Sequence, residues 1–350
     1  MIISVIIPCR NEKDHIGEFL NTLEDQITEP EWELEILVAD GRSNDGTAEY
    51  LCNYATHNPN VRIIDNPERI VSTGLNAAIQ ASTGDIIIRM DAHTVYADDY
   101  ILQCVRVLEE SGADNVGGPW VAEGSGSLGR AIAAAFQSPF CGGGGKARRI
   151  GYNGEVDTVY LGCWRRSAFA RVGLFDPELV RNQDDELNFR IRRKGGRIVQ
   201  SSRIQSTYTP RSSLRTLFRQ YLQYGFWRVA VMRKHGGLAS WRQAVPSLFV
   251  ASIIIGIMLA AVSHFFHWTA VSSFATLIVL GELALYAAAC LASALPMVGS
   301  LELPALLAVP IVVAIHQIAY GLGFLAGLLK PPRFAAGAPV ADRLFSSLTR

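Results

Sequence analysis

The chain is predicted to fold as an α/β domain with a doubly wound sheet, followed by a region embedded in lipid. Short apolar runs alternate with helical patterns through the first half of its 350 residues, and polar residues follow the ends of those runs. Residues 245–329 contain no Lys or Arg, and their only acidic residues are Glu282 and Glu302. A soluble domain of that length rarely carries so few charges, so this part is expected in a membrane.

Four strand–helix pairs are expected in the first half, because each apolar run of strand length is followed by apolar residues at helical spacing. This order predicts parallel strands that bind ligands at their carboxyl ends. Further strand and helix signals lie at 159–172 and 184–194. The expected strands are 2–7, 34–39, 61–64 and 86–90, and the expected helices are 11–23, 45–51, 71–79 and 98–108.

Four regions are expected along the chain: an α/β domain at 1–207, a basic amphipathic segment at 208–244, a transmembrane region at 245–330 and a tail at 331–350. Residues 203–242 contain eight Lys or Arg and no acidic residue. A basic helix directly before lipid-spanning segments is expected on the cytoplasmic membrane surface. The alternative is an ordinary surface helix of the soluble domain.

Residues 117–154 are rich in small side chains and are expected to form a mobile loop region. Within this region, 142–145 are glycines, followed by Lys146, Arg148 and Arg149. This segment is expected either to fold over a bound diphosphate or to remain a loop in solvent.

Three apolar stretches, at 246–263, 269–295 and 303–329, approach or exceed the ~20 residues that a membrane crossing needs. Three crossings are therefore expected. Lys330 and Arg333 after the last stretch conflict with that number, because basic flanks on the cytoplasmic side at both ends require an even number. A re-entrant stretch, a stretch that divides in two, or a tail on the outer side would remove the conflict.

The six cysteines have no paired metal spacing, which is typical of free thiols in a reducing compartment. The first residues, MIISVIIPCRNE, have no basic leader and are expected to form a strand rather than a signal peptide.

A candidate metal site follows the strand 86–90, where Arg89, Asp91 and His93 emerge at the carboxyl end. Asp91 and His93 are two residues apart, so strand alternation predicts that both face the same side and one divalent ion. At the end of the second strand, Asp40 can accept hydrogen bonds from a base or a ribose, and Ser43 can contact phosphates.

A candidate general base lies in the sequence RNQDDELNFR, where Asp184, Asp185 and Glu186 begin a helix beside Arg190. One of these carboxylates can serve as the base if it reaches an acceptor hydroxyl. The alternative is a solvated acidic cluster that stabilises the helix N-terminus through the helix dipole.

Two nucleotide-binding classes are excluded by their motifs. A dinucleotide-binding enzyme requires G-x-G-x-x-G after the first strand, and IIPCRNE has none. The sequence GGGGK at 142–146 lacks the first Gly of a P-loop, a following Ser or Thr, and a preceding strand.

The segments VIIPCRNE, VADGRSNDGT, RIVSTGLNAAIQASTGDIIIRMDAH, GCWRRSAFARVGLFDP and QDDEL occur in an order that resembles the family 2 inverting glycosyltransferases of the GT-A fold. The resemblance covers residues 2–228 and is greatest to the membrane-associated glucosyltransferases of succinoglycan assembly. It implies a GT-A catalytic domain with a mixed, Rossmann-like sheet, an amphipathic interfacial helix and C-terminal transmembrane helices.

The resemblance also implies roles for individual residues. Asp184 corresponds to the catalytic base, with Asp185 as the alternative, and Asp91 corresponds to the ligand of Mg²⁺ or Mn²⁺. His93 stands where the family has a second Asp, so it is expected either to ligate the metal or to touch only phosphate. The implied donor-binding residues are Pro8, Arg10, Glu12, Asp40, Ser43, Arg89, Asp91, Gln220 and Arg228.

The implied activity is transfer of a single sugar, glucose, from a UDP-sugar to a polyprenyl-diphosphate-linked saccharide in bacterial exopolysaccharide assembly. A single addition is expected because the Gln-x-x-Arg-Trp pattern of processive synthases is absent. The implied location is the bacterial plasma membrane, with contact to lipid, a cytoplasmic catalytic domain and no nucleic-acid partner. Because Gln183 and His93 depart from the family pattern, a non-catalytic scaffold that binds sugar nucleotides is the alternative.

Overall fold

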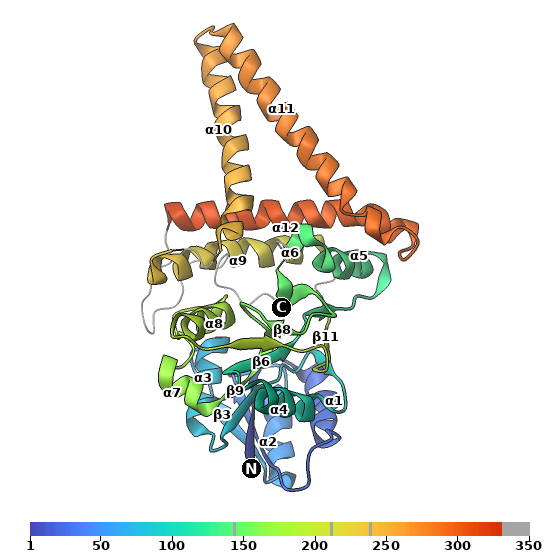
Figure 1. The fold of residues 1–350 in the computed structure, drawn as a ribbon, viewed down its shortest axis with the longest axis vertical. Helices are drawn as coiled ribbons and strands as arrows, with labels where there is room; N and C mark the ends of the chain where they lie inside the picture. The colour runs from blue at the N-terminus through green and yellow to red at the C-terminus, as the bar shows by residue number, and fades with distance from the viewer. Residues whose placement is uncertain (143–144, 211–212, 238–239, 331–350) are drawn as a thin grey trace. The chain divides into compact units, whose positions relative to one another are not determined.

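The computed structural model describes residues 1–142, 145–210, 213–237 and 240–330. The chain forms two compact units, each described by itself below (Figure 1). Within the described residues, the first comprises 1–121 and 145–209, and the second comprises 122–142, 210, 213–237 and 240–330.

A mixed sheet forms the centre of the first unit. Its first four strands are parallel to one another, whereas β9 runs antiparallel between β4 and β6. The expected α/β fold with a mixed sheet is therefore confirmed. In spatial order, the strands described are β3 (Val61–Asp65), β2 (Glu33–Asp40), β1 (Ile2–Cys9), β4 (Ile86–Arg89), β9 (Tyr160–Arg165), β6 (Asn115–Gly118), β10 (Ile198–Gln200) and β8 (Gly154–Glu155).

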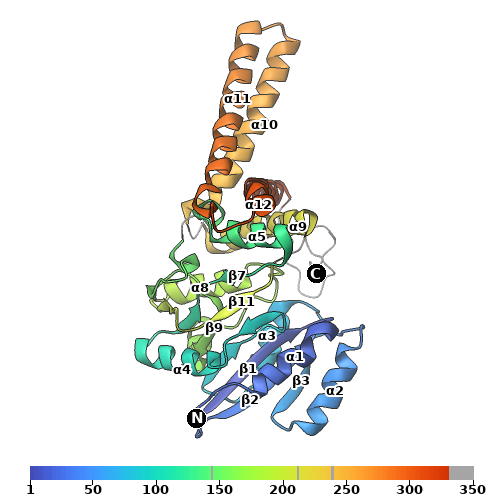
Figure 2. The ribbon, with the colours of Figure 1, turned by 90° about the vertical axis from the view of Figure 1, so that its right-hand side faces the viewer.

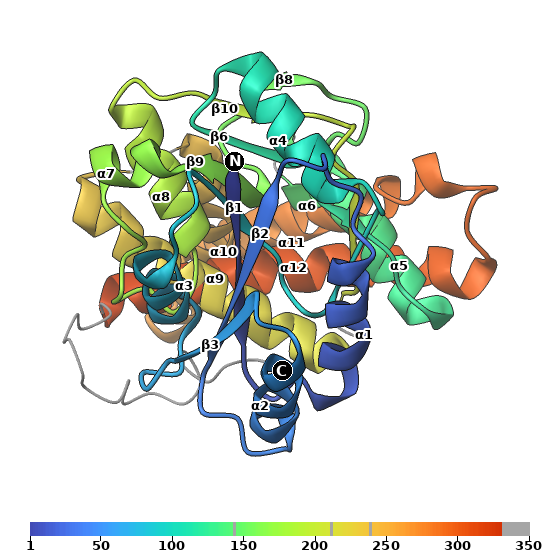
Figure 3. The same ribbon diagram turned by 90° about the horizontal axis from the view of Figure 1, so that it is seen from below.

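Helices cover both faces of this sheet, which is why the strands read as almost continuous apolar runs. Figure 3 shows α3 and α1 on opposite sides of β1. The expected helices are confirmed with shifted ends, and a small second sheet joins β5 (Thr94–Tyr96), β11 (Ser206–Tyr208) and β7 (Val121–Ala122). The helices described in this unit are α1 (Lys13–Glu24), α2 (Thr47–His57), α3 (Val71–Ala81), α4 (Tyr100–Ser111), α7 (Arg166–Val172) and α8 (Gln183–Arg193), with a 3₁₀ turn η1 (Lys146–Arg148).

Strand alternation divides the core of the first unit into two layers. Ile3 and Val5 of β1 pack with apolar residues of α1 and α4, while Ile6, on the opposite face, packs with Leu75 of α3 and Leu187 of α8. Each of these five side chains is fully buried. The burial of both faces therefore fixes the register in which the carboxyl ends of β1, β2 and β4 meet.

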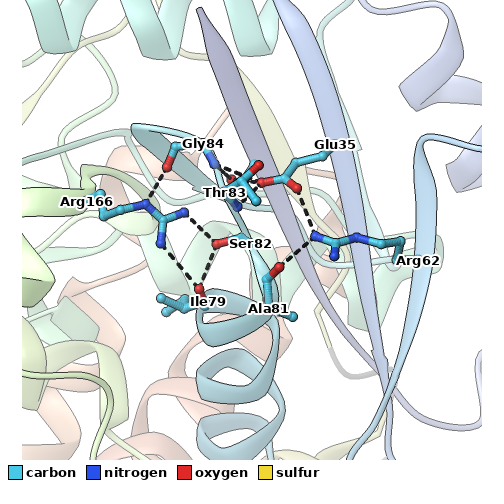
Figure 4. Close-up of polar contacts among 9 residues, drawn as sticks. Glu35, Arg62, Ile79, Ala81, Ser82, Thr83, Gly84 and Arg166 are labelled. Atoms are coloured by element: carbon cyan, nitrogen blue, oxygen red, sulfur yellow. Dashed lines mark hydrogen bonds and ion pairs between the residues drawn. The ribbon is translucent and has the colours of Figure 1, made fainter.

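The turn that leads into β4 is held by two charged side chains (Figure 4). Glu35 accepts hydrogen bonds from the amides of Thr83 (2.5 Å) and Gly84 (2.9 Å). Arg166 donates to the Gly84 carbonyl (2.5 Å) and to the Ser82 hydroxyl (2.7 Å). A Cβ at position 84 would lie 2.7 Å from the Ile2 carbonyl oxygen, so only glycine fits there. These contacts anchor the amino end of the strand whose other end carries Arg89.

The second unit is helical in the part that the structure describes. Its α10 and α11 form a long hairpin (Figure 2). A basic helix was expected near 211–234, and α9 confirms the helix; its place on a membrane surface remains a prediction. The elements are α5 (Gly126–Gln137), α6 (Pro139–Gly142), α9 (Leu214–His235), η2 (Trp241–Ala244), α10 (Val245–Phe265), α11 (Thr269–Ala292), η3 (Leu295–Met297) and α12 (Leu303–Leu329).

The expectation of a loop throughout 117–154 was wrong for 126–142, which form α5 and α6. The small residues of α5 are mainly alanines, which favour helix, and its Ile132 and Phe136 are buried. Small side chains therefore indicated close helix packing here and not a loop. Residues 143–144 of the glycine run lie outside the described part of the chain.

Three helices of the second unit are long and apolar enough to cross a membrane, in a search of the described residues. They span Trp241–Phe265, Thr269–Met297 and Leu303–Leu329. The three long apolar C-terminal helices are thus confirmed as elements. The two polar residues in them that are costliest in lipid contact neighbouring helices: Glu282 accepts a hydrogen bond from Ser252 (3.1 Å), and the rings of His316 and Tyr221 lie 3.8 Å apart.

Candidate active site

Three strand ends and one helix start bring the candidate residues together in the first unit. In the sheet register, Cys9 of β1 pairs with Asp40 of β2, and Ile6 of β1 pairs with Arg89 of β4. The polar segments after β1, β2 and β4 are therefore neighbours at one edge of the sheet, as expected from parallel strands.

The segments after β1 and β2 are joined through Ser43. Its hydroxyl donates to Asp40 Oδ1 (2.5 Å) and accepts from the Asn11 amide (2.8 Å), while its own amide donates to Asp40 Oδ2 (3.1 Å). Arg10 packs beside them, since a Cβ at Gly41 would lie 3.1 Å from Arg10 Cδ. Burial and the nearby Arg69 lower the pKa of Arg10. Pro8 lies within β1, two residues before Arg10.

Glu12 follows this cluster and is nearly completely buried. Its amide donates to the Thr47 hydroxyl (2.9 Å), and that hydroxyl donates to Asp45 Oδ1 (2.6 Å). The Thr47 amide also donates to Asp45 Oδ1 (3.0 Å), so Asp45 holds the first residue of α2. His93 Nδ1 lies 3.9 Å from Glu12 Oε1, so the segments after β1 and β4 meet at these two side chains.

Arg89 is the centre of the site. Its guanidinium holds Asp91 through two bonds, Nε to Oδ1 (2.8 Å) and Nη2 to Oδ2 (3.0 Å). Its remaining nitrogen, Nη1, donates to Asp184 Oδ1 (2.6 Å). Arg89 is 5% exposed, and the two carboxylates together raise its pKa against the opposing effect of burial. One buried cation thus joins the candidate metal ligand to the candidate base.

Burial raises the pKa of Asp184 above the ordinary value of an aspartate. Arg89 opposes this rise, whereas the negative charges of Asp91 and Asp185 add to it. A carboxylate with a raised pKa binds a proton more strongly, which is the property that a general base requires.

The three acidic residues at the start of α8 have three different partners. Asp184 pairs with Arg89, and Asp185 Oδ1 accepts from the Thr158 hydroxyl (3.1 Å). Glu186 is 1% exposed and forms a two-bond ion pair with Arg190, at 2.7 Å for each bond. Arg190 also donates to the carbonyls of Val172 (2.6 Å) and Leu174 (2.7 Å). Glu186 therefore has a structural role, and the other two face the strand ends.

Asp91 offers carboxylate oxygens to a divalent metal. Among the residues that the structure describes, no three His, Cys, Asp or Glu side chains are grouped to hold a metal ion. A carboxylate has about four lone-pair positions, and Arg89 uses two of those of Asp91. Mg²⁺ is commonly held by one or two carboxylates together with substrate phosphates. Asp91 fits a metal of this kind, which a bound diphosphate would complete.

The argument that placed His93 beside Asp91 does not apply. Strand β4 ends at Arg89, and Asp91 and His93 belong to the turn before β5, so the two-residue alternation of a strand stops before them. His93 instead lies near Glu12 and makes an edge contact with the Tyr208 ring, at 6.2 Å between centroids.

Gln220 and Arg228 are in α9 of the second unit and are both buried there. Gln220 Nε2 donates to the Tyr224 hydroxyl (3.2 Å), one turn further along the same helix. The remaining candidates lie in the first unit, so the donor role of these two residues remains a prediction.

Several polar and aromatic side chains at the site were not singled out from the sequence. Thr158 joins Asp185 to Asn188, and the Tyr96 hydroxyl accepts from the Asp91 amide (2.6 Å). Trp120 stacks on Tyr160, with 5.9 Å between ring centroids. Burial and the charge of Asp91 raise the pKa of Tyr160. Tyr96 and Tyr160 lie on antiparallel strands of two different sheets, and Thr158 and Trp120 lie on loops, so no local pattern indicates them.

Comparisons with known proteins show the family of this chain. The profile of glycosyl transferase family 2 matches residues 4–173. Succinoglycan biosynthesis protein ExoA of Rhizobium meliloti (strain 1021) is 35% identical over 272 residues, which cover 76% of this chain and 79% of that protein.

Two further comparisons extend over nearly the whole chain. A dolichyl N-acetyl-alpha-D-glucosaminyl phosphate 3-beta-D-2,3-diacetamido-2,3-dideoxy-beta-D-glucuronosyltransferase of Methanococcus voltae is 25% identical over 336 residues, covering 94% of this chain and 97% of that protein. Mannosyltransferase PcManGT from Pyrobaculum calidifontis, solved in complex with GDP-Man and Mn²⁺, has a similar fold. Its TM-score is 0.56 at 18% identity, covering 94% of this chain and 87% of that one.

Proposed function

The chain belongs to glycosyl transferase family 2, an inverting family, and from this premise we propose that it transfers one glucose from a UDP-sugar to a polyprenyl-diphosphate-linked saccharide. The observation that carries the proposal is the bridge of Arg89 between Asp91 and Asp184, at the edge where the strand ends meet. It joins a carboxylate suited to a diphosphate-bound metal to a carboxylate suited to proton removal.

The donor side of the proposed site consists of the ends of β1, β2 and β4. Asp40 and Arg10 would hold the base and ribose, together with Pro8 and Glu12, and Ser43 and Arg89 would contact the phosphates. Asp91 would hold Mg²⁺ or Mn²⁺. When bound, the metal supplies positive charge against the diphosphate that leaves. PcManGT was solved with GDP-Man and Mn²⁺, which supports testing Mn²⁺ and a GDP-sugar as well as UDP-sugars.

Asp184 is the proposed general base. It would remove the proton from the acceptor hydroxyl as that oxygen attacks the anomeric carbon opposite the leaving diphosphate, which inverts the configuration. Arg89 would keep the Asp184 carboxylate oriented and ionised for this step. Alignment of donor and acceptor supplies a large share of the remaining rate acceleration.

The acceptor is proposed from the membrane-like character of the second unit. Three candidate spans indicate association with a membrane, and a polyprenyl diphosphate is a membrane-anchored anion. The Methanococcus voltae relative is named for a dolichyl-linked sugar phosphate, which supports an acceptor of this class. We place the catalytic domain, residues 1–207, on the cytoplasmic side of a bacterial plasma membrane, with 208–244 on its surface.

The test is nucleotide release from a panel of UDP- and GDP-sugars by the detergent-purified full chain, with Mg²⁺ or Mn²⁺ and a polyprenyl-diphosphate-linked acceptor. Metal-dependent release that the acceptor stimulates is the expected result. Asp184→Asn should lower transfer by about 10²–10⁴-fold and retain nucleotide binding, since general bases typically contribute that much. Asp185→Asn is the matched control, and retained transfer in Asp184→Asn with loss in Asp185→Asn would move the base to Asp185.

A second candidate function is a sugar-nucleotide-binding scaffold without turnover. It is favoured by one observation: both carboxylate oxygens of Asp91 already accept from Arg89. Binding of UDP without metal, and without release from any donor in the panel, would support the scaffold and contradict the transferase.

A further inference from the structure

The contact between α12 and α9 distinguishes α12 from the other two candidate spans. A Cβ at Gly323 of α12 would lie 1.9 Å from the Leu222 carbonyl oxygen, and a Cβ at Gly225 of α9 would lie 2.0 Å from the Tyr320 carbonyl oxygen. The two helix backbones therefore touch directly. At Gly327, a Cβ would still lie only 2.9 Å from the Phe226 carbonyl oxygen, so the contact continues to the end of α12.

Helix α9 has a composition that does not suit a membrane crossing. It carries five Lys or Arg in 22 residues, and the search for spans in the described residues does not include it. Arg228 lies in its interior and Arg233 near its end. An arginine at the centre of a crossing helix costs about 2.5–3.5 kcal/mol on insertion scales. The second half of α12 is in backbone contact with α9, so α12 must lie in the same environment as α9.

Polar contacts tie α12 to other helices of the second unit at its start, middle and end. At its start, Glu302 accepts from Arg130 of α5 (2.6 Å). In its middle, Gln317 donates to the Phe140 carbonyl of α6 (2.6 Å). At its end, the Leu328 carbonyl accepts from Arg233 of α9 (3.0 Å).

These contacts conflict with a crossing. With 27 residues, α12 is about 40 Å long, close to the thickness of a bilayer with its headgroups. If α12 crossed the membrane, Arg130 and Arg233 would lie at opposite surfaces, and α5 and α9 would have to span the bilayer between them. Helix α9, with five Lys or Arg, is too polar to span the bilayer, and α5, with 12 residues, is too short.

Helices α10 and α11 behave differently. They pack on each other as a hairpin and expose large apolar side chains, including Ile255 and Leu277. In the most apolar 18-residue stretch of each helix, the buried share is 11% for α10 and 17% for α11, against 39% for α12. Figure 1 shows the hairpin directed away from α12 and α9, which run side by side.

We propose that only α10 and α11 cross the membrane, and that α12 lies flat in the lipid interface with α5 and α9. The occupant of its open side is the bilayer itself. Leu303, Leu307 and Ile311 are exposed at four-residue spacing and so form one apolar stripe along the first third of α12. Its other sides are covered by α5, α9 and the start of α10. A stripe of this kind, continuous with a membrane-inserted hairpin, fits the acyl-chain boundary of a bilayer.

Two crossings also satisfy the charges that flank the apolar region. Arg242 precedes α10, and Lys330 follows α12. With an even number of crossings, both lie on the same side as the basic helix α9, as the positive-inside rule requires. With three crossings, Lys330 would lie on the other side.

The test is cysteine labelling of the full chain in cells with a membrane-impermeant maleimide, before and after permeabilisation. Cys52 is exposed on the first unit and marks the side of that unit. Ser347→Cys reports the tail, and Phe266→Cys reports the turn of the hairpin; both are made in a Cys52→Ser background. We expect Ser347→Cys to react under the same condition as Cys52, and Phe266→Cys under the opposite one.

Two results would overturn the proposal. Reaction of Ser347→Cys and Cys52 from opposite sides would establish a third crossing. Reaction of Phe266→Cys from the same side as Cys52 would show that the hairpin does not cross. Neither readout depends on sugar transfer, so the outcome is independent of the proposed activity.

Discussion

Arg89 Nη1 lies 2.6 Å from Asp184 Oδ1, while the rest of the same guanidinium binds both oxygens of Asp91. Arg89 and Asp91 belong to β4 and the turn after it, whereas Asp184 begins α8, 95 positions after Arg89. A single cation therefore opposes the raised pKa of the proposed base and orients the proposed metal ligand. A change at Arg89 should affect both.

Replacement of Arg89 should move the acidic limb of the rate profile. Arg89 opposes the raised pKa of Asp184, so Arg89→Met should raise that pKa further. The base must be deprotonated, so the acidic limb of kcat/KM should move to higher pH. The loss at neutral pH should be on the order of 10- to 100-fold, the value of a charge-assisted hydrogen bond.

The control for this prediction is Arg89→Lys, which keeps the charge and loses the fork. Arg89→Lys should lower kcat/KM but move the acidic limb of the pH profile less than Arg89→Met does. An unchanged pH profile in folded Arg89→Met would contradict the coupling between Arg89 and Asp184.

Removal of metal should abolish transfer, because the metal is proposed to supply the positive charge against the leaving diphosphate. If His93 is also a ligand, His93→Ala should lower Mn²⁺-supported transfer on the order of tenfold and affect Mg²⁺-supported transfer less, since imidazole suits Mn²⁺ better. His57→Ala, at an exposed histidine of α2, is the control. If His93→Ala and wild type transfer at equal rates with Mn²⁺, and also with Mg²⁺, His93 is not a ligand and its role is phosphate contact or packing.

Glu35 should make stability depend on pH. Burial raises its pKa, but hydrogen bonds from Ser4 and from the amides of Thr83 and Gly84 outweigh burial and lower it below 4.5. A lowered pKa stabilises the fold above the unfolded value and loses that effect as pH falls through the folded value. Glu35→Gln should therefore reduce stability by on the order of 1–3 kcal/mol near pH 7, and by little at acid pH.

The measurement for Glu35 is the midpoint of thermal unfolding in detergent from pH 3 to 7. Glu33→Gln, an exposed position of the same strand, is the control. A difference between Glu35→Gln and wild type that stays constant down to pH 3 would show that the charge of Glu35 is not what holds the turn.

The glycines between α9 and α12 should be intolerant of a side chain. Gly323→Ala places a Cβ against the Leu222 carbonyl, where no rotamer change can relieve the overlap. We expect the free energy of unfolding to fall by about 1–3 kcal/mol. Gly281→Ala in α11 meets nothing within 4 Å and should be neutral or slightly stabilising. Thermal unfolding of both variants in the same detergent compares them. Equal midpoints would mean that α12 does not pack on α9 as described.

The order of the sequence motifs indicated the family. The residue pattern predicted the fold class and the first four strand–helix pairs. Local patterns were sufficient for these, because apolar period, strand length and the polar residues after each strand are properties of neighbouring positions. The same patterns placed Asp40, Asp91 and Asp184 at or next to the ends of their elements. They misjudged 126–142 because small residues suit both loops and close helix packing.

The tertiary structure decided what the candidate residues contact. The run Asp184–Asp185–Glu186 is uniform in sequence, yet its members pair with Arg89, Thr158 and Arg190, because a helix turns successive side chains about 100° apart. In the second unit, the apolar composition of α12 equals that of a crossing helix. Its contacts with α5 and α9 distinguish it from α10 and α11, since hydropathy counts side chains and takes no account of the helices that cover them.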